Sequence, residues 1–322
     1  MRSGHKVVSI GAALIIAAAL LYYSLRGISW GHVGHTLGSA KPGPLLLVAA
    51  LGSASLLLRA LRWRLLLNAE APVSVPAAFQ ATAAGYFGNN FLPARGGELV
   101  RTLMISSRST LDAAYVLATA LSERVADAIA LVVISGAVLL ALPAQPGWLA
   151  GAARPFAILG LAGAAAIAIL PLIESAAAKA LRRLPLPHML RLRVIAALEQ
   201  GLRGLRAFHD GRRLAGFLAF TIVIWCLDAV GTIVAAAALG FAMSIPVAFL
   251  LITGLGVASA LPSTPGYVGL YQFVAVTVLT PFGFSRSDAI AFILVVQALT
   301  YVVIGCWGGW ALWRYQRTPR PA

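Results

Sequence analysis

Charged residues are scarce in this chain, making up 11% of its 322 residues, against about 25% in average soluble domains. Hydrophobic residues account for 60% of the sequence, and the mean hydropathy is +0.88. This composition is atypical of a water-soluble globular protein and typical of a chain embedded in lipid.

Cysteines and catalytic motifs are also few. The two cysteines, Cys226 and Cys306, lie inside apolar stretches, where neither a metal cluster nor a disulfide framework is expected. The sequence has no GxxxxGKS or GxxxxGKT nucleotide loop, no HExxH pair and no GxSxG elbow, and none of its five histidines falls within an apolar span. We therefore expect no cofactor, no metal and no enzymatic activity, and ATP-driven pumping by this chain alone is not indicated.

Acidic residues are outnumbered, with 10 Asp and Glu against 25 Lys and Arg and a formal net charge of +15. The basic residues gather at the ends of apolar stretches and in Glu174–Arg213, which holds nine of them against three acidic residues. The positive-inside rule places this segment in the cytoplasm. The charge thus indicates orientation rather than a nucleic-acid partner, and the segment is where anionic lipid or a lipid-modifying enzyme would bind.

Six apolar stretches approach or exceed the length needed to cross a hydrocarbon core of about 30 Å. They are Val7–Leu25, Pro44–Leu58 with its basic continuation to Leu67, Val125–Pro143, Pro155–Ile173, Ala215–Met243 and Ala289–Leu312. The first follows a short basic segment without a small-x-small cleavage site, so we expect a retained anchor. Fixing the basic segment inside then places both termini in the cytoplasm and the protein in the cell membrane.

Two further apolar segments, Pro76–Pro93 and Pro246–Pro262, are poor spanning helices. About 17 helical residues reach only about 25 Å before each proline. If both crossed fully, the basic segments could not all remain on one side. We predict re-entrant hairpins, the first entering from the cytoplasm and the second from outside, with their broken backbone buried in protein or lining a polar cavity.

The two hairpins resemble each other, because each starts with a proline followed three residues later by phenylalanine and ends in Leu-Pro with a glycine four residues on. The next helices begin with Ser109-x-x-Asp112 and Ser285-x-x-Asp288. Short, interrupted segments at corresponding positions are typical of inverted-repeat transporters.

We therefore predict an all-α polytopic membrane protein of about six full transmembrane helices plus two re-entrant broken-helix hairpins arranged as an inverted repeat. The chain is expected to form a single domain, residues 1–322. Its parts are an anchor helix and outer loop (1–43), a first repeat (44–143), a connecting helix and basic loop (144–214), an inverted second repeat (215–314) and a basic tail (315–322).

The first hairpin tip carries the strongest candidate site. A broken helix exposes backbone N–H groups that favour an anion, and Arg95 and Arg101 can grip a phosphate with paired donors. Asn89 and Asn90 add polar groups beside them. The alternative is structural: Glu98 complements the helix N-terminus and pairs with Arg101, while Arg95 reaches the cytoplasmic surface.

The second hairpin tip is uncharged, and its candidates are Thr264, Gly266 and Gln272. It is expected to form a less discriminating end of a path, or else to serve only close helix packing through its glycines.

Ionisable residues inside spans are costly, by at least about 2.5–3.5 kcal/mol each, and are functional candidates by default. Asp228 lies near the middle of its span. Glu123, Arg124 and Asp127 lie near the expected cytoplasmic start of theirs, and Arg124 and Asp127 are spaced to pair. The alternative is that these groups only hold helices together.

The chain resembles the lysylphosphatidylglycerol synthase/flippase-like transmembrane family. The matching motifs are Arg62-Trp63-x-x-Leu66-Leu67, the block from Asn89 to Arg101, Glu123-Arg124-x-x-Asp127 and Pro262-x-x-Pro265-Gly266-x-x-Gly269. The resemblance implies flipping or handling of lipids, including aminoacylated phosphatidylglycerol, with links in some branches to polyprenyl-linked sugars or hopanoids. The soluble aminoacyl-transfer domain of the full-length synthase has no counterpart in this sequence, so synthase activity is not implied.

Together these features predict a flippase or transporter for a phosphate-bearing lipid: a phospholipid, an aminoacylated phospholipid or a polyprenyl-linked lipid. One alternative is a non-transporting subunit or scaffold of a lipid-modifying or glycosylation pathway. Another is a membrane-embedded lipid enzyme that uses Glu98, Glu123 or Asp127 as acid or base.

Overall fold

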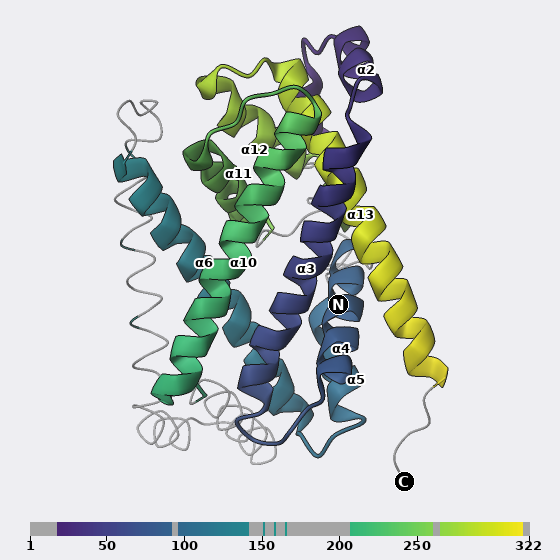
Figure 1. The fold of residues 1–322 in the computed structure, drawn as a ribbon, viewed down its shortest axis with the longest axis vertical. Coiled ribbons are helices and arrows are strands. Elements are labelled where there is room, and N and C mark those ends of the chain that lie inside the picture. Colours follow the sequence, from purple (N-terminus) through teal and green to yellow (C-terminus); the bar gives the residue numbers. More distant parts are fainter. Residues whose placement is uncertain are drawn as a thin grey trace, which may run out of the picture.

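A computed structural model describes residues 18–91, 96–141, 207–259 and 265–317, together with the single helical residues 151, 158 and 165. Within these ranges every regular element is a helix, as predicted (Figure 1). The helices are α2 (Trp30–Gly38), α3 (Pro42–Leu67), α4 (Val75–Phe91), α5 (Gly97–Ser106), α6 (Ala113–Ala141), α10 (Gly211–Ala238), α11 (Ile245–Ala258), α12 (Leu270–Leu279) and α13 (Arg286–Arg317), with short 3-10 turns η2 (Ala207–His209), η3 (Pro265–Tyr267) and η4 (Thr280–Phe282).

Three of these helices, α3, α10 and α13, are long and apolar enough to cross a membrane, with 26, 28 and 32 residues. They confirm three of the predicted spans. Most of Val7–Leu25, nearly all of Pro155–Ile173 and the basic segment up to residue 206 lie outside the described residues.

Helix α6 begins at Ala113, whereas the predicted span began at Val125. The carboxylate of Asp112 accepts a hydrogen bond from the Ala114 N–H at 2.7 Å, which caps the new helix end. The first turns are rich in alanine and leucine, both strong helix formers. Glu123, Arg124 and Asp127 therefore lie well inside the helix, and their expected position near its start was wrong.

The two short-helix pairs lie toward opposite ends of the long axis, α4 with α5 in the lower half of Figure 1 and α11 with α12 in the upper half. α4 and α11 have 17 and 14 residues, so both predicted hairpin segments do form short helices. Both end before the prolines at positions 93 and 262, which lie outside the described residues.

The chain runs twice through the same order of one long helix, two short helices and another long helix. α3 packs along α10, while α4 packs on α13 and α11 packs on α6. A glycine lies at each of these last two crossings. A Cβ on Gly308 of α13 would lie 2.4 Å from Phe87 Cβ of α4, and one on Gly256 of α11 would lie 2.4 Å from Leu131 Cδ1 of α6. The crossing at Gly308 thus depends on the absence of a side chain, because the Ala83 carbonyl oxygen of α4 also lies 3.0 Å from the added Cβ, whereas at Gly256 the end of the Leu131 side chain would have to move.

Candidate functional site: a buried network of arginines and carboxylates

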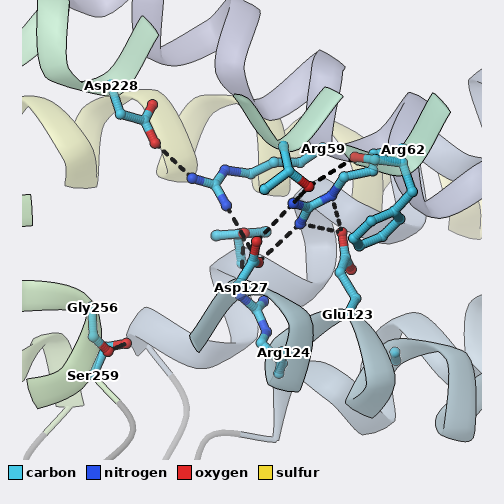
Figure 2. Close-up of polar contacts among 12 residues, drawn as sticks. Arg59, Arg62, Glu123, Arg124, Asp127, Asp228, Gly256 and Ser259 are labelled. Atoms are coloured by element: carbon cyan, nitrogen blue, oxygen red, sulfur yellow. Dashed lines mark hydrogen bonds and ion pairs between the residues drawn. The ribbon is translucent and has the colours of Figure 1, made fainter. Parts of the chain in front are cut away.

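Four arginines and four carboxylates from four helices form one connected network, most of which Figure 2 shows. Its members are Arg59 and Arg62 on α3, Glu98 and Arg101 on α5, Glu123, Arg124 and Asp127 on α6, and Asp228 on α10. The formal charges balance, four against four. Such balance is what allows charges to remain within helices that face lipid, because an unpaired ion there is strongly disfavoured.

Arg62 is the innermost cation, with a fully buried side chain. It donates to both carboxylate oxygens of Asp127, at 2.7 and 2.9 Å, and to Glu123 Oε1 at 2.9 Å. A further bond runs from its Nη1 to Thr221 Oγ1 at 3.0 Å, and its guanidinium lies 4.7 Å from the centre of the Phe217 ring. Arg62 therefore ties α3 to α6 and α10 with nearly all its donors used.

Arg101 is almost as enclosed, with 1% of its side chain exposed. It donates to Glu123 Oε2 at 2.8 Å and to the Ala120 carbonyl at 3.0 Å, and its Nε lies 2.5 Å from Glu98 Oε2. Its guanidinium stacks 4.5 Å from the Trp63 ring centre. Glu123 thus bridges Arg62 and Arg101 and fastens α5 into the bundle.

The network also has an accessible edge. Arg124 has 35% of its side chain exposed, Asp228 24% and Glu98 17%. Arg124 donates to Glu98 Oε1 at 2.8 Å and to the Tyr86 hydroxyl at 3.2 Å. Arg59 donates to Asp228 Oδ2 at 2.6 Å. A ligand reaching the network would meet these groups first.

Aromatic rings flank the edge. The Arg59 guanidinium lies 5.8 Å from the Tyr86 ring centre and 5.0 Å from that of Trp225. The indole N–H of Trp225 is buried and has no hydrogen-bond partner among the described residues. A buried donor left without an acceptor is unfavourable, so the edge offers one donor that an incoming acceptor can satisfy.

The end of α4 reaches the same edge through Asn89. Its amide donates to Glu98 Oε1 at 3.3 Å, and its oxygen accepts from the Gly97 N–H at 3.1 Å. Asn90 instead donates to the Tyr86 carbonyl at 2.9 Å, within its own helix. Asn89 therefore joins the network, whereas Asn90 does not.

The described residues that follow the predicted second hairpin tip form a separate neutral cluster. The Gly266 carbonyl accepts from Gln297 Nε2 at 2.8 Å and from the Tyr301 hydroxyl at 2.5 Å. Gln272 donates to Gln297 Oε1 at 2.6 Å and accepts from the Gly269 N–H at 2.8 Å. Gly266 has a φ of +70°, and a Cβ there would lie 2.2 Å from the Tyr301 oxygen. The glycine is required by both backbone and packing.

Of the predicted site residues, the structure brings six into the charged network: Glu98, Arg101, Glu123, Arg124, Asp127 and Asp228. The Glu98–Arg101 pair, which was the structural alternative to a phosphate site at Arg95 and Arg101, is present. The predicted Arg124–Asp127 pair was wrong, because Asp127 is engaged by both terminal nitrogens of Arg62 while Arg124 turns to Glu98. Arg95 and Thr264 lie outside the described residues.

Sequence reasoning did not include Arg59 and Arg62 among the candidate site residues. Both were interpreted as basic residues at the cytoplasmic end of a span, and Arg62 also as the first residue of a family motif. The available signal was their position inside a 26-residue helix that continues to Leu67. Two arginines three residues apart on such a helix share a face and need internal acids.

A cavity of about 280 Å³ lies apart from the network. It is bounded by the start of α4, the end of α5 and the end of α13, and its lining includes Gln80, Arg108 and Tyr315. Within the described ranges, no three His, Cys, Asp or Glu side chains are grouped to hold a metal ion.

The long apolar helices and the internal ion network define a multi-pass membrane protein. The chain belongs to the lysylphosphatidylglycerol synthase TM region family, whose profile matches residues 10–308. It is also similar to a protein named Glycosyltransferase AglD from Haloferax volcanii, with 28% identity over 307 residues, covering 84% of this chain and 48% of that protein. The chain thus spans about half the length of this curated relative. No solved structure matches the chain significantly.

Proposed function

We propose that this protein binds lipids with a phosphate-bearing headgroup at the accessible edge of the network and moves them across the cell membrane. The observation that carries the proposal is the partly exposed Arg124, held beside Glu98 and Tyr86 where α4 gives way to α5. The buried half of the network is sufficient to tie α3, α5 and α6 together. The charged side chains at the edge are therefore not needed to hold these helices together.

The chemistry of the edge suits a phosphate. A guanidinium binds two phosphate oxygens at once, and Arg124 is the most exposed guanidinium of the network. The first turn of α5 adds backbone N–H groups with partial positive charge. The Asn89 amide and the Trp225 indole N–H are further donors within the same region. The predicted contribution of Arg95 remains part of this proposal.

Movement across the bilayer is supported by the repeated architecture. We propose that α3 to α6 and α10 to α13 form an inverted repeat whose short helices re-enter from opposite sides. The equal order of helices and the reciprocal packing of α4 on α13 and of α11 on α6 support this relation. The charged first tip then recognises the headgroup, and the neutral second tip forms the other end of the path.

The direct test is the rate of transbilayer movement of fluorescent phosphatidylglycerol in vesicles containing the purified protein. The wild-type protein should accelerate movement over empty vesicles, and Arg124→Gln should lower the rate toward the empty-vesicle value. Arg286→Gln is the matched control. Arg286 is the first residue of α13 and lies outside the network, where it contacts the carbonyl and the ring of Tyr23. Equal rates in protein-containing and empty vesicles would contradict the proposal.

A second candidate function is a non-enzymatic membrane subunit that presents a polyprenyl-linked lipid in a glycosylation pathway. It is favoured by the similarity to a relative named as a glycosyltransferase. Deleting residues 176–206, part of the basic segment, should then abolish association with the partner enzyme while Arg124→Gln leaves it intact. Glycosyl transfer by the purified chain alone would instead indicate that it is itself an enzyme.

A further inference from the structure

We infer that Glu98 is a resident carboxylate occupying the anion site of the headgroup, so that a lipid phosphate binds by displacing it. The inference rests on the proposed function only in taking the displacing anion to be a lipid phosphate. Glu98 then sets how strongly the site holds its ligand, and Arg124 is the cation that changes partners.

The surroundings of the Glu98 carboxylate are those of a bound anion. Oε1 accepts from Arg124 Nε at 2.8 Å and from Asn89 Nδ2 at 3.3 Å, while Oε2 lies 2.5 Å from Arg101 Nε. The residue is the second of α5, where the helix dipole favours negative charge. Two guanidinium groups, an amide and a helix N-terminus thus converge on one carboxylate.

Displacement of the Glu98 side chain affects two arginines. Arg101 loses its 2.5 Å contact with Glu98 Oε2 but keeps its 2.8 Å bond to Glu123 Oε2, whereas Arg124 loses its carboxylate partner. A phosphate diester carries one negative charge and replaces the displaced carboxylate one for one, while the Glu98 carboxylate, already 17% exposed, turns to the accessible side. The Glu98 backbone stays in place, because its carbonyl accepts from Thr102 Oγ1 at 2.6 Å and only the side chain must turn.

The other network carboxylates are poorer candidates for exchange. Glu123 bridges Arg62 and Arg101 with 5% of its side chain exposed, and Asp127 is held by both terminal nitrogens of Arg62. Removing either would leave a buried arginine undercompensated. Asp228 is accessible, but it pairs with Arg59 on the other flank of the edge.

The test measures thermal stability of the full chain in detergent during titration with phosphatidylglycerol, phosphatidylcholine or inorganic phosphate. Glu98→Gln keeps the side-chain length and an oxygen that accepts from Arg124, but removes the competing charge. We expect half-maximal stabilisation by phosphatidylglycerol at a concentration on the order of tenfold lower than for the wild type. Glu70→Gln is the matched control, because it changes the net charge equally at an exposed residue outside the network and should show no such gain.

Unchanged or weaker binding by Glu98→Gln would overturn the inference, as would an equal gain in Glu70→Gln, which would reflect net charge alone. Adding Arg124→Gln to Glu98→Gln should abolish the gain, and a gain that persists would also overturn it. If Glu98→Gln does not fold, Glu98→Ala is titrated in its place. A gain with inorganic phosphate but none with phosphatidylglycerol would support the exchange and count against the lipid function, so the two can fail separately.

Discussion

Arg62 shows most clearly how single residues determine the stability of this bundle. It lies on α3 with no exposed side-chain surface, and its partners come from α6 and α10. A buried ion pair need not stabilise a protein relative to an apolar pair, but removing one partner leaves the other charge uncompensated. Removing one member of the network should therefore lower the free energy of unfolding by more than the number of ion pairs it makes suggests.

Arg62→Ala leaves Glu123 and Asp127 without their shared cation. We expect the free energy of unfolding to fall by about 3–5 kcal/mol, measured by denaturation of the purified protein in detergent. The control is Arg64→Ala, two residues further along α3, which loses a hydrogen bond from Nε to the Val73 carbonyl and should cost about 1 kcal/mol. Similar losses for both variants would refute the central role of Arg62.

At this scale the sequence indicated acidic members of the network but not the two arginines of α3. Glu123, Asp127 and Asp228 stand out because a charge within an apolar stretch needs a reason. Their partners are chosen by tertiary packing, which a single sequence does not contain. The local Arg124–Asp127 spacing was misleading because Arg62, on another helix, donates two hydrogen bonds to the Asp127 carboxylate. This paired contact is stronger than a contact with Arg124 one turn away.

Among the described glycines, Gly97 of α5 has the closest neighbour, and that neighbour belongs to α4. A Cβ on Gly97 would lie 1.9 Å from the Gly85 carbonyl oxygen and 2.6 Å from Asn89 Oδ1. No flexible side chain can absorb such an overlap, because the obstructing atom belongs to the helix backbone. The geometry of the network edge therefore depends on one glycine at the start of α5.

Gly97→Ala should force α4 and α5 apart and weaken both folding and ligand binding. We expect a loss of several kcal/mol in the free energy of unfolding, in the range of overpacked and strained sites. Gly136→Ala on α6 is the control, since nothing lies within 4 Å of its added Cβ and alanine favours a helix by up to about 1 kcal/mol. Unaltered stability of Gly97→Ala would show that the two helices do not pack as described.

The sequence predicted the helix boundaries that lie next to proline or glycine, and it missed a boundary that does not. The short helices α4 and α11 follow from Pro76, Pro93, Pro246 and Pro262. The beginning of α6 was missed because hydropathy ends an apolar run at its first charged residues. Those charges are neutralised by α3 and α5, so the helix continues through them.

For the molecule as a whole, the fold class could be predicted from the sequence because lipid imposes a strong and simple constraint on composition. The predicted orientation rests on the distribution of basic residues, and two of the residues used for it, Arg59 and Arg62, are network members. The remaining basic residues at the end of α13 and in the segment before α10 still predict a cytoplasmic position for these ends.

Orientation can be tested with single cysteines introduced after Cys226 and Cys306 are replaced by serine. His35 on α2 and Glu70 after α3 are both exposed. Helix α2 and the end of α3 that precedes α4 lie at opposite ends of the long axis (Figure 1). A membrane-impermeant thiol reagent added to intact cells should label a cysteine at position 35 and leave one at position 70 unlabelled. The reverse pattern would invert the proposed topology.

The most direct test of the account is the lipid that the purified protein retains. Native mass spectrometry of protein extracted from membranes containing phosphatidylglycerol and diacylglycerol should show bound phosphatidylglycerol on the wild type and on Arg286→Gln, and a marked loss on Arg124→Gln. Retention of both lipids in equal amounts by all three proteins would contradict the claim that the edge of the arginine and carboxylate network binds a phosphate headgroup.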